Sequence, residues 1–298
     1  MSDRPAPWRL GLTLASGILA VSTSAPLVRL AMAAAMTQTV SFSFVLAALR
    51  LSFAAVMLLP AWRSVAHSKP TPVAIGYAIA AGITLAIHFA TWITSLTFTS
   101  IAASTALVTT NPVWVALLSW VWLGEKPTRR VLLGTGIALI GGLLIGLGGT
   151  DPSATGSHPL LGDGLALVGA WMVSLYFLLG REAQRNGLSL SSYVAIAYSV
   201  AAIALLPLPL LTGTSYTGYS SVVYGYIVLT ALLPQIVGHT SFNWAVRWMS
   251  PTVVTLAILF EPVLASLMGF VLFKEIPDES VLTGALVLLI GVAIAAIA

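Results

Sequence analysis

The residues of this 298-residue chain best suited to holding a small molecule are histidines, tryptophans and amides inside long apolar stretches. His88 and Trp92 lie four residues apart in one stretch, and His239 and Asn243 have the same spacing in another. That spacing places both members of a pair on one face of a helix. Polar groups at membrane depth usually face the protein interior. We therefore expect a cavity between the two pairs; the alternative is that each histidine only bonds a neighbouring helix.

Two further tryptophans are candidates for the same cavity. Trp171 is central in its apolar stretch, although tryptophan ordinarily prefers the membrane interface. At mid-depth its indole N–H needs a partner in packed protein or in a cavity. Trp244 follows Asn243 directly. The predicted substrate-binding residues are His88, Trp92, Trp171, His239, Asn243 and Trp244.

Glu261 is the single carboxylate near the centre of an apolar stretch, and Asn111 is its counterpart in the first half. A carboxylate at this depth is neutral, paired with a cation such as Arg29 or Arg50, or part of a proton relay. The structural alternative is that Glu261 caps the backbone freed by Pro262. We expect both Asn111 and Glu261 to be polar residues at the membrane midplane.

Prolines interrupt four of the apolar stretches, at Pro26, Pro112, Pro234 and Pro262. Proline removes a backbone donor and clashes with the carbonyl four residues earlier, so each is expected to kink its helix. Kinks at matching places in two halves of a chain could serve as hinges or only shape a cavity. Proline is common in membrane helices, so each one alone carries little weight.

No motif in this sequence supports enzymatic chemistry, although serines are plentiful and composition alone does not exclude Ser/His hydrolysis. Cysteine is absent, which excludes thiol, disulfide and cysteine–zinc chemistry. The aspartates lie at the ends of apolar stretches, and neither His-Glu-x-x-His nor a Walker motif occurs. The net charge of +4 comes without a basic cluster interleaved with aromatic residues. We expect no catalysis, no metal, no cofactor and no nucleic acid as partner.

The elements that position these residues are ten apolar stretches. Hydrophobic residues make up 58% of the chain and charged residues only 7%. A membrane-spanning helix needs about 20 mostly apolar residues. The stretches have no period-2 alternation, so they predict an all-α membrane protein rather than a barrel. The expected spans are 10–31, 39–60, 72–95, 100–123, 131–148, 160–181, 189–211, 221–247, 252–273 and 280–298. The fifth and tenth spans carry no polar residue at their centres. They should brace the bundle or mediate self-association through surfaces such as Gly134-x-Gly136 or Gly141-Gly142.

The chain contains an internal repeat. Residues 100–145 align with 250–295 at a shift of 150 without a gap, matching Pro112 to Pro262 and Glu125 to Glu275. The repeat predicts a first five-helix unit at 1–148, a linker at 149–159 and a second unit at 160–298. Because five is odd, the second unit enters the membrane from the opposite side. Most lysines and arginines fall on one side under this arrangement, which predicts cytoplasmic termini.

The repeated motifs resemble the EamA domain of the drug/metabolite transporter superfamily. They are Asn111-Pro112-Val113 with Leu123-Gly124-Glu125-Lys126-Pro127, and Glu261-Pro262-Val263 with Phe273-Lys274-Glu275-Ile276-Pro277. The resemblance covers essentially the whole chain. It implies ten helices as two inverted five-helix repeats and the movement of small metabolites, often outward. Within that superfamily the chain is most similar to aromatic amino-acid exporters of the YddG type.

Architecture, cavity residues and resemblance together predict a transporter in the cell's inner membrane. Inverted repeats are typical of secondary transporters that alternate access around a midplane site. The expected substrates are aromatic or neutral amino acids and related amphipathic metabolites. The expected partner besides the substrate is the lipid bilayer, and the expected oligomeric state is a monomer. The alternatives are a passive pore or facilitator, or a transporter of another metabolite class.

Overall fold

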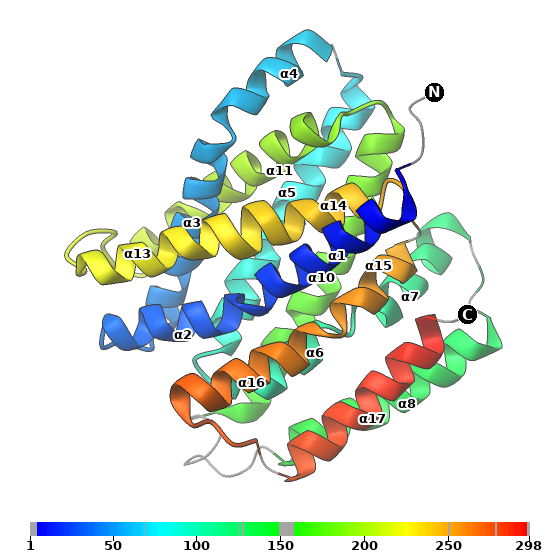
Figure 1. Cartoon of the computed structure of the whole chain (residues 1–298). Coiled ribbons are helices and arrows are strands. Elements are labelled where there is room, and N and C mark those ends of the chain that lie inside the picture. Colours follow the sequence, from blue (N-terminus) through cyan, green and yellow to red (C-terminus); the bar gives the residue numbers. More distant parts are fainter. Residues whose placement is uncertain are drawn as a thin grey trace.

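A computed structural model describes residues 5–68, 70–124, 126, 128–148, 158–249, 251–277 and 279–296. Most of the predicted linker at 149–159 lies outside these residues, as do Glu125 and Pro127 of the first repeated motif. The described chain is helical (Figure 1). Its helices group into ten spans, so the predicted all-α architecture of ten transmembrane helices in two inverted repeats is confirmed.

The spans begin and end within about four residues of the expected positions, except that the second continues through a short helix to Ser68, past its expected end at residue 60. In the first repeat the elements are α1 (Pro7–Ser22) with α2 (Ser24–Ala34), α3 (Val40–Met57) with η1 (Leu59–Ala61) and α4 (Trp62–Ser68), α5 (Pro72–Ser95), α6 (Ile101–Val108) with α7 (Asn111–Leu123), and α8 (Arg129–Gly148). In the second they are α10 (Pro159–Arg185), α11 (Leu190–Leu205) with α12 (Pro207–Leu211), α13 (Ser221–Thr230) with η2 (Ala231–His239) and α14 (Thr240–Ala245), α15 (Pro251–Ile258) with α16 (Glu261–Phe273), and α17 (Glu279–Ala296).

Length and apolar composition agree with membrane insertion. Seven helical segments among the described residues are long and apolar enough to cross a bilayer by themselves. Glu261–Phe273 and Glu279–Gly291 are shorter apolar helices. Several spans start at a Ser or Thr that caps the helix, as where Thr71 Oγ1 accepts a hydrogen bond of 3.2 Å from Ala74 N.

The prolines stand at breaks rather than at simple kinks. The fourth span stops at Val108 and restarts at Asn111, and the ninth stops at Ile258 and restarts at Glu261. Pro112 and Pro262 each occupy the second position of the restarted helix, where a missing N–H costs nothing. The expectation of kinks at these two residues is thus corrected: the helices end there and begin again.

The other two prolines accompany milder irregularities. Pro26 is the third residue of α2, just after the break between α1 and α2 at Thr23. Pro234 lies inside η2, a π-helical segment whose wider turn accommodates the missing backbone donor. All four prolines therefore mark places where a span is irregular, while their action as hinges stays a prediction.

The motif residue Glu275 links the two repeats. Its Oε1 accepts a hydrogen bond of 2.6 Å from the backbone N–H of Ile101, at the start of α6. The first backbone donors of a helix have no partner within the helix, so a carboxylate there satisfies one of them. One function of this motif in the second repeat is thus to cap a broken span of the first.

Helices α8 and α17 lie side by side as a closely packed pair at one edge of the bundle (Figure 1, green and red). A Cβ added to Gly141 would lie 2.3 Å from the backbone nitrogen of Leu288, and one added to Gly291 would lie 2.4 Å from that of Ala138. Gly141 is therefore already packed against another helix of the same chain. The expectation that these spans brace the bundle agrees with this packing, whereas self-association through Gly141 does not.

Candidate functional site

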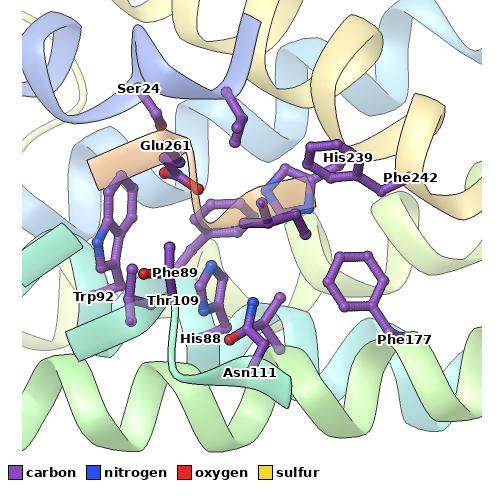
Figure 2. A pocket seen from close by; sticks show the side chains of 14 residues that line it. Ser24, His88, Phe89, Trp92, Thr109, Asn111, Phe177, His239, Phe242 and Glu261 are labelled. Carbon is purple, nitrogen blue, oxygen red and sulfur yellow. The ribbon is translucent and has the colours of Figure 1, made fainter. Parts of the chain in front are cut away.

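A small cavity lies where the broken spans meet (Figure 2). Its volume is about 30 Å³, which is room for only one or two water molecules. The first and second halves of the chain both contribute to it. The lining residues are Val21, Ser24, His88, Phe89, Trp92, Val108, Thr109, Asn111, Val173, Phe177, His239, Phe242, Ile258 and Glu261.

The structure brings His88, Trp92 and His239 together in this cavity. The rings of His88 and Trp92 are parallel within 2°, with centroids 6.0 Å apart, and the two histidine rings lie 6.2 Å apart. His88 Nδ1 is 2.9 Å from the carbonyl oxygen of Gly169 and must donate to it, so Nε2 of the neutral ring is an acceptor. Trp92 Nε1 and His239 Nδ1 are buried without a hydrogen-bond partner. Unsatisfied buried donors and acceptors are costly, and a bound ligand could satisfy them.

Asn111 and Glu261 also line the cavity, each as the first residue of a restarted helix. Both side chains are buried, and Asn111 Oδ1 has no partner. Figure 2 shows the Glu261 carboxylate beside Ser24 at one edge of the cavity and Asn111 on the opposite side. The two repeats therefore place an amide and a carboxylate at equivalent breaks of the fourth and ninth spans.

Neither arginine suggested as a partner forms an ion pair with Glu261. Arg50 is fully buried; its Nε donates to Gln235 Oε1 at 3.1 Å and its Nη1 to Ser24 Oγ at 2.6 Å. Arg29 donates from Nη2 to the carbonyl of Thr99 at 2.6 Å. Among the described residues, no nitrogen of either guanidinium lies within 4.0 Å of the Glu261 carboxylate.

Trp171 lies outside the cavity, contrary to the expectation that it lines the same space as the histidines. Its side chain is 45% exposed and packs against Trp114, with ring centroids 6.2 Å apart. Val173 and Phe177 form the face of α10 that reaches the cavity. Two residues along a helix correspond to about 200° of rotation, which turns Trp171 away from that face.

Asn243 and Trp244 also lie outside the cavity. Asn243 is fully buried and donates from Nδ2 to the hydroxyl of Tyr176; its backbone carbonyl oxygen accepts from Gln184 Nε2 at 3.1 Å. Trp244 is half-buried and packs against Trp248. The four-residue spacing from His239 places Asn243 one turn further along the span, where it joins α14 to α10.

Apart from Trp92, the aromatic side chains that form the cavity wall were not predicted from the sequence. Phe89 follows His88, Phe177 lies four residues after Val173, and Phe242 lies three after His239. Helical spacing from the two histidines could have indicated Phe242. Ser24 and Thr109 carried another usable signal, since both are polar residues within a few positions of a proline in an apolar stretch.

The arrangement is suited to binding a ligand rather than to covalent chemistry. Within the described chain, no group of three or more His, Cys, Asp or Glu residues could hold a metal ion. Aromatic walls offer contact to an apolar group, and the unpartnered atoms of Trp92, Asn111 and His239 offer hydrogen bonds. A molecule of amino-acid size requires the lining helices to separate before it can bind.

Three comparisons bear on the identity of the chain. The pattern of the EamA-like transporter family matches residues 11–147 and 160–297. A protein of Streptantibioticus cattleyicolor described as a probable terminal-alkyne amino-acid exporter is 27% identical over 188 residues, which is 62% of this chain and 61% of that protein. A solved crystal structure with 18% identity covers 97% of both chains with a TM-score of 0.63, and so shares the fold. Because the family pattern occurs twice and covers nearly the whole chain, the protein belongs to the EamA-like transporter family, whose members are transporters and not enzymes.

Proposed function

We propose that the protein is a secondary transporter that exports aromatic and neutral amino acids and related small metabolites by alternating access. The observation that carries the proposal is the small cavity at the junction of the broken spans, with buried polar atoms that lack partners. In secondary transporters, substrate sites typically lie at midplane between discontinuous helices of the two repeats. Here the α6–α7 and α15–α16 breaks both border the cavity.

The substrate class is supported by the chemistry of the lining and by the relative. Phe89, Trp92, Phe177 and Phe242 form walls suited to an apolar or aromatic group. No lysine or arginine is among the cavity's lining residues, all of which are described, so a phosphorylated substrate would lack the cations it needs. The relative from Streptantibioticus cattleyicolor is named for amino-acid export.

A passive pore or facilitator is the main alternative. A pore requires a continuous open path, whereas the cavity in this conformation has a volume of only about 30 Å³. A cavity this small favours a carrier whose helices rearrange to expose the substrate to one side at a time. We propose the inner membrane as its location, with both termini cytoplasmic and the transporter acting as a monomer. The tight use of Gly141 and Gly291 within one chain supports the monomer.

Counterflow in liposomes tests the proposal. Purified protein is reconstituted, and uptake of radiolabelled phenylalanine is compared with and without unlabelled phenylalanine preloaded inside. A carrier should show saturable uptake that preloading stimulates, because the loaded site returns faster than the empty one. Uptake that neither saturates nor responds to preloading would support the pore. Absence of uptake for every amino acid would reject the substrate class.

Two tryptophan substitutions separate the cavity from the outer face of α10. We expect Trp92→Ala to raise the half-saturating phenylalanine concentration about tenfold, which corresponds to about 1.4 kcal/mol of binding, because it removes a wall and a free donor. Trp171→Ala is the matched control on the exposed face and should leave that concentration within about twofold of wild type. Equal effects of the two substitutions would contradict the assignment of the cavity as the substrate site.

A further inference from the structure

The charges around the cavity are unevenly distributed. Glu261 is the one formally charged side chain among the lining residues, all of which the structure describes. The carboxylate is in contact with the cavity, and among the described residues it receives no hydrogen bond and forms no ion pair within 4.0 Å. A carboxylate buried at membrane depth without a partner is costly. Such a group is stabilised either by a proton or by a cation, and a cation can arrive with the ligand.

Arg50 is near enough to interact electrostatically with Glu261 but does not line the cavity. Its guanidinium is held by Ser24 and Gln235, and its Cζ lies 4.1 Å from the centroid of the Phe89 ring. Phe89 and Ser24 line the cavity, so Arg50 belongs to the layer behind it. The arginine therefore leaves the cavity-facing side of the Glu261 carboxylate open to a ligand.

The neutral polar groups of the cavity include further acceptors. Asn111 Oδ1 is an unpartnered acceptor, and His88 Nε2 is an acceptor in the neutral ring because Nδ1 donates to Gly169. Aromatic ring faces, which also attract cations, complete the walls. A carboxylate with neutral acceptors and aromatic faces is suited to a group that carries several N–H donors and a positive charge.

We propose that Glu261 binds the α-ammonium group of the transported amino acid, with the aromatic walls receiving its side chain. This assignment rests on the proposed function and specifies which half of the amino acid the site recognises. It makes a free amino group a requirement for binding, and it makes the substrate's carboxylate secondary. It also gives the two repeats different tasks, since the equivalent position in the first repeat is the neutral Asn111.

Competition in the counterflow assay tests the assignment directly. Radiolabelled phenylalanine is the probe, and the competitors are phenethylamine, which lacks the carboxylate, and 3-phenylpropionate, which lacks the amine. We expect phenethylamine to compete within about tenfold of phenylalanine and 3-phenylpropionate to be at least about 100-fold weaker, since a site built for a charged hydrogen bond rejects the analogue without it. Equal competition by 3-phenylpropionate and phenylalanine would overturn the proposal while leaving amino-acid transport in place.

Glu261→Gln provides the matched variant, with Glu182→Gln as the same chemical change at a partly exposed carboxylate outside the cavity that is paired to Arg185. Glu261→Gln should weaken phenylalanine at least tenfold and reduce the preference over 3-phenylpropionate by a similar factor, and Glu182→Gln should change neither. Exchange by Glu261→Gln with unchanged preference, and with loss only of pH-dependent uptake, would overturn the proposal in favour of a proton relay. If Glu261→Gln fails to fold, the competitor series on the wild-type protein still decides. Binding of phenethylamine without transport of any amino acid would reject the proposed function and retain the ammonium site.

Discussion

Gly141→Leu and Gly291→Leu are each expected to lower the free energy of unfolding by more than about 3 kcal/mol, since small-to-large changes cost about 1–3 kcal/mol where the surroundings can adjust. Here the surroundings are backbone atoms. A Cβ at Gly141 would lie 2.3 Å from Leu288 N and 2.7 Å from Gly284 O, and one at Gly291 would lie 2.4 Å from Ala138 N and 2.6 Å from Gly134 O. Neither set of contacts is relieved by a side-chain rotation, so α8 and α17 must separate.

The measurement is the apparent Tm of the purified variants in detergent. A loss of 3 kcal/mol corresponds to a fall of about 6 °C or more. Gly136→Leu is the matched control, because a Cβ there meets nothing within 4 Å and the residue is exposed on α8. Its Tm should stay within about 2 °C of wild type. Equal stability of Gly141→Leu and Gly136→Leu would mean that α8 and α17 do not approach each other closely at Gly141.

Most of the architecture could be predicted from the sequence, because membrane insertion ties hydropathy to helix length. The third span illustrates this: the expected range 72–95 is also the range of α5. The 150-residue shift matched Pro112 to Pro262, and both open a restarted helix. Hydropathy does not distinguish a kink from a break, since that depends on whether neighbouring groups satisfy the freed backbone. The hydrogen bond from the Ile101 backbone N–H to Glu275 could not be predicted from the sequence either, because the two residues lie 174 positions apart and meet only in the tertiary fold.

The candidate site was only partly predictable. The four-residue spacing of His88 and Trp92 fixed a shared face, and both line the cavity. The position of a residue along a span does not determine which face of the helix carries its side chain. For this reason Trp171 was expected to line the cavity, whereas it lies on the exposed face of α10. The partner of a buried charge also depends on tertiary contacts. Arg50 was considered as a partner for Glu261, whereas the fold gives it to Ser24 and Gln235.

The second large effect concerns buried Arg50 and its hydrogen-bond partners Ser24 and Gln235. We expect removal of an acceptor to lower the free energy of unfolding more than removal of the arginine does. Gln235→Leu leaves the buried guanidinium with one hydrogen bond fewer, in addition to its already unpartnered Nη2. Hydrogen bonds to charged groups contribute about 1.5–3 kcal/mol, and a buried cation without acceptors keeps its full desolvation cost. We expect Gln235→Leu to destabilise the protein by at least about 2 kcal/mol, seen as a fall in apparent Tm of several degrees.

Arg50→Met removes the buried charge together with its desolvation cost, and the hydrogen-bond partners that it leaves, Ser24 and Gln235, are neutral. The electrostatic interaction with Glu261 is lost as well, but the two groups form no ion pair within 4.0 Å. The Tm of Arg50→Met should therefore fall less than that of Gln235→Leu. The double variant should be more stable than Gln235→Leu alone, because the charge that needed the acceptor is gone. Gln184→Leu serves as the control, since Gln184 is a buried glutamine whose amide donates only to the neutral carbonyls of Gly180 and Asn243. A larger loss for Arg50→Met than for Gln235→Leu would show that the guanidinium stabilises the bundle through its contact with Phe89 rather than depending on its acceptors. Dependence of Arg50 on Gln235 has a consequence for transport, because this hydrogen bond joins α3 to η2. The irregular segment η2 also carries His239, which lines the cavity. The hydrogen bond therefore couples the first repeat to the cavity wall that the second repeat supplies.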